Sequence, residues 1–180
     1  RLTSQPSENE RVVISGGGTG SGKTSNLIAI EPAVKGDVNI IYDTTLSYFD
    51  HSNKIIEQAL NSGRSVTVVY VYGDPYDAFV NGVLPRAKKI GRGVGCPYHI
   101  TSHVNSRVVV GELLKRYSQD PRFELLVIDG SRGVEDRRIV SITSLPKLNR
   151  INLESRINEA ISKANKEGLI DSKTLEILNV

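Results

Sequence analysis

Gly17-Gly18-Thr19-Gly20-Ser21-Gly22-Lys23-Thr24 is the most specific pattern in this 180-residue sequence. It fits G-x-x-x-x-G-K-[ST], the pattern of a phosphate-binding loop. A β-branched run, residues 11–15, precedes the pattern, and residues 23–33 can form a helix after it. In such a strand–loop–helix unit, backbone N–H groups and the positive end of the helix face a polyphosphate. The sequence therefore predicts a nucleoside triphosphate site.

The predicted site takes each of its residues from this one segment. Lys23 is expected to reach the β- and γ-phosphates of ATP or GTP, and the Thr24 hydroxyl is expected to bind Mg²⁺. The predicted nucleotide-binding residues are Gly17, Gly18, Thr19, Gly20, Ser21, Gly22, Lys23, Thr24 and Ser25.

Composition limits the classes of protein to which the chain can belong. Hydrophobic residues make up 38% and charged residues 24%, and no apolar run approaches the eighteen or so residues of a membrane span. The formal net charge of +3 is mild, and the lone Cys96 excludes an internal disulfide. We therefore expect a cytoplasmic protein without a membrane partner. Because the sequence lacks Met and begins at Arg1, we also expect a domain of a larger polypeptide.

Apolar and β-branched runs alternate with segments of helical spacing. The predicted strands are residues 11–15, 37–42, 65–72, 123–128 and 138–142, and the predicted helices are 23–33, 52–61, 74–89, 105–117, 153–164 and 172–178. This alternation predicts an α/β fold of the three-layer P-loop NTPase type, with a mainly parallel sheet of about five strands and helices on both faces.

Residues 85–103 differ in character from their surroundings. They contain Arg86, Lys88, Lys89 and Arg92, followed by several glycines and Pro97. We expect a basic, Gly-rich functional loop here, because such a segment is too polar for a core. Pro97 and the glycines argue against a helix, so His99 and His103 are interpreted as residues of this loop, either facing solvent, which is favoured, or touching the substrate, and not as metal ligands.

Several motifs together resemble P-loop kinases of the zeta toxin and polynucleotide kinase-like families. They are residues 17–24, the strand end Tyr42-Asp43-Thr44-Thr45, the run Val69 to Pro75, the segment Arg86 to Val94 and the late strand Leu126 to Ser131. The resemblance covers residues 11–145. It implies an ATP-dependent kinase in which Lys23, Arg86 and Arg92 surround the transferring phosphoryl group. The expected organisation is a linker (1–10), a P-loop kinase-like domain (11–150) and C-terminal helices packed on the core (151–180).

One departure from these families concerns the catalytic base. Their members usually carry another strand after the first helix, and this strand ends in the aspartate that deprotonates the acceptor hydroxyl. Residues 32–37 leave no room for that strand. Either Asp43 has taken over as base, or the base is lost.

Three functions therefore stay open. The first is a kinase of zeta toxin type, with a small nucleotide-like or sugar acceptor favoured over nucleic acid because the net charge is mild. The second is an ATPase, because four apolar residues before Asp129 also fit a Walker B strand whose carboxylate holds magnesium. The third is a catalytically dead nucleotide-binding module.

Overall fold

A computed structural model of the protein describes residues 10–25, 37–133 and 135–179. The five strands of the described residues form one sheet in the order β2-β1-β3-β4-β5. Neighbouring strands are parallel up to β4, and only the short edge strand β5 is antiparallel. The strands are β1 (Glu10–Gly16), β2 (Asp37–Asp43), β3 (Ser65–Tyr72), β4 (Phe123–Asp129) and β5 (Arg138–Ile139). The predicted α/β class with a mainly parallel sheet is confirmed.

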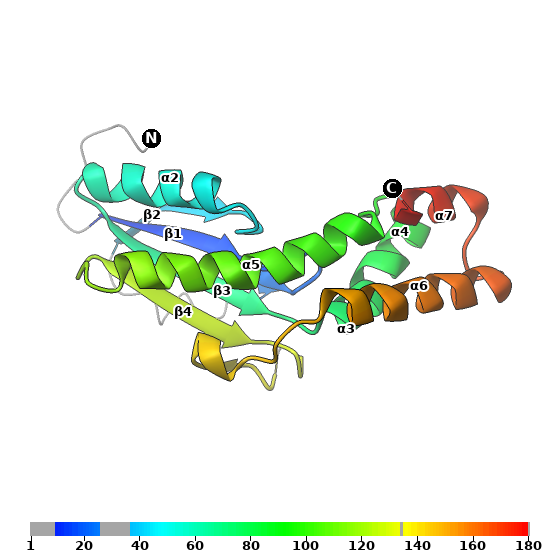
Figure 1. Ribbon diagram of the computed structural model, residues 1–180. Helices are drawn as coiled ribbons and strands as arrows, with labels where there is room; N and C mark the ends of the chain where they lie inside the picture. The colour runs from blue at the N-terminus through cyan, green and yellow to red at the C-terminus, as the bar shows by residue number, and fades with distance from the viewer. Residues whose placement is uncertain (1–9, 26–36, 134, 180) are drawn as a thin grey trace.

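The main core lies on one face of the sheet. Helices α2 (Phe49–Asn61) and α5 (Cys96–Tyr117) cover that face (Figure 1). Alternate residues of each strand point to it, so Val12 and Ile14 of β1 are fully buried there beside Ile56 of α2 and Val110 of α5.

A smaller buried cluster lies on the other face of the sheet. It contains Val13, Val69, Val71 and Ile128. The helix predicted for residues 23–33 begins as expected, since residues 23–25 are helical, but residues 26–36 lie outside the described part of the chain.

A second hydrophobic core lies beyond the carboxyl ends of the strands (Figure 1). It joins Phe79, Ala87, Ile100, Ile157 and Leu178, all nearly or fully buried. The elements that build it are α3 (Pro75–Ala78), the π-helical turn η2 (Phe79–Val83), α4 (Leu84–Ile90), the start of α5, α6 (Arg150–Lys166) and α7 (Ser172–Asn179). The C-terminal helices thus pack on α3 to α5, and α5 contributes residues to both cores.

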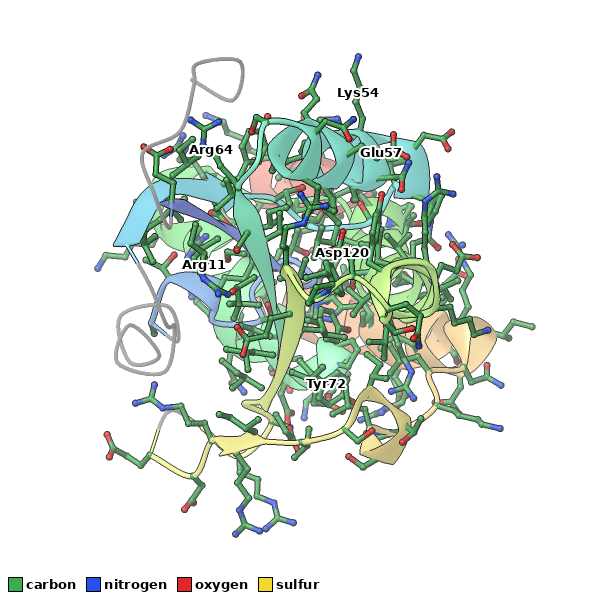
Figure 2. All side chains as sticks on the ribbon, turned by 90° about the vertical axis from the view of Figure 1, so that its left-hand side faces the viewer. Arg11, Lys54, Glu57, Arg64, Tyr72 and Asp120 are labelled. Carbon is green, nitrogen blue, oxygen red and sulfur yellow. The ribbon has the colours of Figure 1, made fainter. Side chains whose placement is uncertain are left out.

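Charged side chains tie the strands together at the amino end of the sheet, which faces the viewer in Figure 2. Arg11 of β1 reaches past β3 to Glu124 of β4, with 3.0 Å between Nη1 and Oε2, and Arg64 forms a 2.8 Å ion pair with Glu10. The carboxyl end of the sheet, where the phosphate-loop pattern follows β1, lies on the opposite side.

Two expectations about helices were wrong. Residues 85–103 are mostly helical: α4 continues to Ile90 and α5 begins at Cys96, so only residues 91–95 form the connection. Pro97 does not prevent the helix. The N–H groups of a first helical turn make no hydrogen bond within the helix, so a proline, which lacks an N–H, is tolerated there. Helix α2 begins at Phe49, before the predicted Ser52, and it ends as predicted, with Gly63 at φ 87°.

Among the described residues, no helix is both long enough and apolar enough to cross a membrane.

Candidate nucleotide-binding site

The phosphate loop lies at the carboxyl end of β1. Gly16 ends the strand, and Lys23 begins the helical residues 23–25. The Ser21 N–H donates to the Gly18 carbonyl at 3.2 Å, and Gly20 turns the chain with a φ of 75°. A residue with a Cβ is strained at such a φ, so this turn needs glycine. The loop adopts the compact shape that the pattern predicts.

Lys23 folds back over this loop. Its Nζ donates to the carbonyl oxygens of Gly17 and Gly18 at 3.1 and 3.2 Å. Burial lowers the pKa of Lys23, and the negative charge of Asp43 opposes that shift. The ammonium group therefore lies against the loop and within the electrostatic reach of Asp43.

Asp43 ends β2, the strand beside β1. It pairs in register with Ser15, whose Oγ donates to Asp43 Oδ1 at 3.3 Å. The Asp43 side chain is exposed. Asp43 thus ends the strand adjacent to the phosphate-loop strand, and its carboxylate is open to a substrate.

Asp129 ends β4, and β3 lies between β4 and β1. Its Oδ1 accepts a hydrogen bond of 3.0 Å from the Ser131 N–H, and its side chain is partly buried. Of the two candidate carboxylates, Asp43 is the one on the strand next to the phosphate loop.

A cavity of about 330 Å³ opens beside the loop. Its walls are unusually rich in glycine and so leave backbone exposed to a ligand. The wall residues are Gly20, Ser21, Gly22, Gly73, Asp74, Asp77, Ala78, Asn81, Gly82, Gly130, Ser131 and Gly133. Ser21 Oγ is buried and makes no hydrogen bond within the described residues. We call this space the glycine-walled cavity.

Arg86 and Arg92 lie outside this wall. Both side chains are exposed, Arg86 on α4 and Arg92 in the connection from α4 to α5. Arg86 follows Gly82 of the wall by four residues, which is about one helical turn. The two arginines therefore sit on the segment that leads away from the cavity.

Three residues of α5, which sequence reasoning did not assign to the site, contact the loop. Ser102 Oγ and His103 Nε2 lie 3.0 and 2.9 Å from the backbone N and O of Thr19, and His99 Nδ1 lies 2.7 Å from its hydroxyl. His99 and His103 are buried, so the interpretation as solvent-facing residues was wrong. Their spacing of three and four was the available signal, because it places 99, 102 and 103 on one helix face.

The oxygen donors beside the phosphate loop are of the kind that magnesium takes. Among the described residues, no group of three His, Cys, Asp or Glu side chains gathers as a metal site. The Thr24 hydroxyl and the Asp43 carboxylate are exposed oxygen donors beside the loop. Mg²⁺ takes oxygen ligands and commonly needs only one or two from the protein besides the phosphates.

Several solved structures are similar in fold, among them the following three. Two are crystal structures of the AvrRxo1-ORF1:AvrRxo1-ORF2 complex. The one with sulphate ions has a TM-score of 0.56 and 14% identity and covers 87% of this chain and 65% of the matched chain. The one with ATP has a TM-score of 0.56 and 14% identity, and the match covers 92% of this chain and 73% of the matched chain.

The third belongs to the PezAT chromosomal toxin–antitoxin system of Streptococcus pneumoniae, with a TM-score of 0.54, 13% identity and coverage of 94% and 91%. At these identities the likeness concerns the fold, and this chain spans less than two thirds of the first AvrRxo1 chain.

The sequence itself identifies the family. No curated relative matches the chain. The family model for zeta toxin matches residues 27–135, more than half of the chain. Together with the loop and the parallel sheet, this match identifies the chain as a member of the zeta toxin family, a family of ATP-dependent P-loop kinases.

Proposed function

We propose that the protein is an ATP-dependent phosphotransferase that moves the γ-phosphate to a hydroxyl of a nucleotide-like or sugar acceptor. The observation that carries the proposal is the pairing of Ser15 with Asp43 at the carboxyl ends of β1 and β2. It places a carboxylate next to the phosphate loop, where a kinase needs a group that accepts the acceptor's proton. The similar AvrRxo1 complexes were crystallised with ATP and with sulphate ions, which supports a phosphate site on this fold.

The phosphate loop supplies binding. The helical residues 23–25 would present their backbone N–H groups and the positive end of the helix to the polyphosphate, and Lys23 would exchange its contacts with the Gly17 and Gly18 carbonyls for phosphate oxygens. Thr24, with Asp43 or Asp129, would hold Mg²⁺, which neutralises phosphate charge when bound. The glycine-walled cavity adjoins Gly20 and Gly22, so it is the space available to the rest of the nucleotide.

Asp43 is the proposed base. As the acceptor oxygen forms its bond to the γ-phosphorus, its proton passes to the Asp43 carboxylate, and ADP leaves with the electron pair of the broken bond. The exposed carboxylate accepts a long hydrogen bond of 3.3 Å from the Ser15 hydroxyl, so it is available to the hydroxyl of an acceptor.

Arg86 and Arg92 are proposed to stabilise the transferring group. They are exposed and lie on the segment that begins about one turn beyond the cavity wall. Arginines in this role contribute through charge on the γ-phosphoryl oxygens. Closing of the segment over the nucleotide would bring them to those oxygens.

Incubation with γ-labelled ATP and a panel of nucleotide sugars, nucleosides and 5′-hydroxyl oligonucleotides tests the function. Label on a nucleotide sugar or nucleoside is the expected result. Label on the oligonucleotides alone would contradict the small acceptor. Free phosphate alone would indicate an ATPase, and no turnover with intact ATP binding would indicate a binding module.

Asp43→Asn tests the proposed base. The amide still holds a hydroxyl but does not take its proton, so transfer should fall at least a hundredfold while ATP affinity changes less than threefold. Asp50→Asn, an exposed acid in the first turn of α2, is the matched control and should keep parental turnover. Parental transfer by Asp43→Asn would exclude Asp43 as base, and a parallel loss of Mg-ATP affinity would assign it to magnesium.

A further inference from the structure

Thr19 is held by helix α5 through every polar group that it has. Its N–H donates to Ser102 Oγ at 3.0 Å, its hydroxyl contacts His99 Nδ1 at 2.7 Å, and its carbonyl oxygen contacts His103 Nε2 at 2.9 Å. Thr19 lies between Gly18 and Gly20 in the phosphate loop. Glycine-rich backbone has the most conformational freedom to lose on ordering. Helix α5 therefore restrains the glycine-rich part of the phosphate loop, which has the most backbone freedom of its own.

The partners determine the tautomer of both histidines. A carbonyl oxygen only accepts, so His103 Nε2 donates to Thr19, and His99 Nε2 donates to the Pro75 carbonyl at 2.8 Å. His99 Nδ1 then has a free lone pair and accepts from the Thr19 hydroxyl. Ser102 Oγ donates to the His99 carbonyl and is left to accept from the Thr19 N–H. The hydrogen bonds thus form one consistent set around neutral histidines.

Packing keeps the two rings in place. His99 and His103 are 0% and 2% exposed, with ring centroids 4.6 Å apart, and Phe79 meets His99 edge-on at 5.2 Å. A Cβ at Gly18 would overlap the His103 ring. The loop and the helix therefore approach as closely as a glycine allows.

We propose that His99, Ser102 and His103 are positioning residues that hold the phosphate loop in its nucleotide-binding shape. The inference rests on the proposed function, because it concerns the affinity of that site for a nucleoside triphosphate. None of the three side chains needs to touch the nucleotide. They act through Thr19, and His99 also ties the loop to Pro75, the first residue of α3 and a neighbour of the cavity wall.

ATP affinity of two His103 variants tests the proposal. His103→Ala removes the donor to Thr19 and should weaken ATP binding at least tenfold. His103→Gln places an amide nitrogen near the position of Nε2 and should restore affinity to within threefold of the parental value. Val110→Ala, a fully buried change about two turns further along the same helix and within the main core, should stay within twofold even where it lowers Tm. Equal affinity of His103→Ala and the parental protein would overturn the proposal.

Amide hydrogen exchange of the free protein supplies a second readout that needs no nucleotide. Ser102→Ala removes the acceptor of the Thr19 N–H, so exchange at Thr19 and its neighbours should rise at least tenfold while the main core stays protected. Unchanged exchange in this variant would overturn the proposal.

The two readouts separate the failure of the inference from that of the proposed function. If the parental protein and Lys23→Ala both fail to bind ATP while exchange rises as expected, the nucleotide site itself is wrong, and with it the positioning role. If Lys23→Ala loses affinity and His103→Ala keeps it, only the positioning role is wrong.

Discussion

Lys23 holds a positive charge where burial disfavours it. Its pKa is lowered by that burial, and the Asp43 carboxylate opposes the shift. Its ammonium group bonds to the loop carbonyls of Gly17 and Gly18. A bound polyphosphate offers the same ammonium stronger, charged acceptors. The side chain is thus poised to exchange neutral partners for anionic ones.

Replacing Lys23 with Ala should weaken ATP affinity at least tenfold, about 1.4 kcal/mol. The loss follows because the phosphates lose their point charge while the loop backbone keeps its other contacts. Titration calorimetry measures it, and Lys54→Ala, an exposed lysine on α2 (Figure 2), is the control that should not change affinity. Unchanged affinity of Lys23→Ala would remove the phosphate-loop assignment.

At the scale of elements, a short connection joins α4 to α5 on the segment that leads away from the glycine-walled cavity. Gly91 ends α4 in the left-handed conformation with a φ of 64°, and Gly95 precedes α5. The connection of residues 91–95 carries Arg92, and Arg86 lies on the exposed side of α4. Two glycines flank the basic connection, so it has the backbone freedom that closure over a nucleotide requires.

Arg86→Ala and Arg92→Ala should each lower kcat far more than they raise the KM for ATP. A charge that acts on the transferring group stabilises the transition state and adds little to ground-state binding. Steady-state kinetics with the labelled-ATP assay measure both constants. Lys89→Ala, also exposed on α4, is the matched control and should keep both constants. If both arginine variants retain parental kcat, the segment has no catalytic role.

At the scale of the whole molecule, α5 joins two cores. Its first turns pack with α3, α4, α6 and α7, and its later turns pack on the sheet. His99 and His103 lie near the junction and against the phosphate loop. The order of the nucleotide site therefore depends on how the two cores are held together.

These buried histidines should make folding stability pH-dependent. Burial lowers the pKa of His99, and burial with the nearby charges of His99 and Lys23 lowers the pKa of His103 to about 3. Between about pH 6.5 and pH 3 His103 binds a proton in the unfolded chain but not in the folded chain. Its contribution to stability is therefore full above pH 6.5 and decreases as the pH falls, by up to about 1.4 kcal/mol per pH unit, and the lowered pKa of His99 acts in the same direction.

Urea unfolding between pH 7.5 and 5, above the range in which most carboxylates titrate, measures this slope. His103→Gln removes one titrating group and should flatten it, whereas His51→Gln, an exposed histidine of α2, should not. Equal slopes for the parental protein and His103→Gln would show that His103 binds its proton equally well in the folded and unfolded chain, so that folding does not lower its pKa.

Local sequence determined the strands and the phosphate loop. The run Ser65–Tyr72 forms β3 with the predicted bounds, since Val, Thr and Tyr favour a buried parallel strand. The glycines and Lys23 specify the loop, because phosphate binding uses backbone geometry contained in eight consecutive residues. Asp43 also followed from sequence, since a carboxylate that ends a parallel strand reaches the same edge as its neighbours.

Only the tertiary structure decided what surrounds that loop. Thr19 and His103 are 84 positions apart, and their contact depends on how α5 crosses the sheet. Burial turns the two histidines from expected surface residues into neutral hydrogen-bond partners, and no local pattern records burial of a polar side chain. The sequence alone thus determined which atoms can bind a phosphate, while the packing of α5 decided what keeps them in place, because that support comes from contacts distant in the chain.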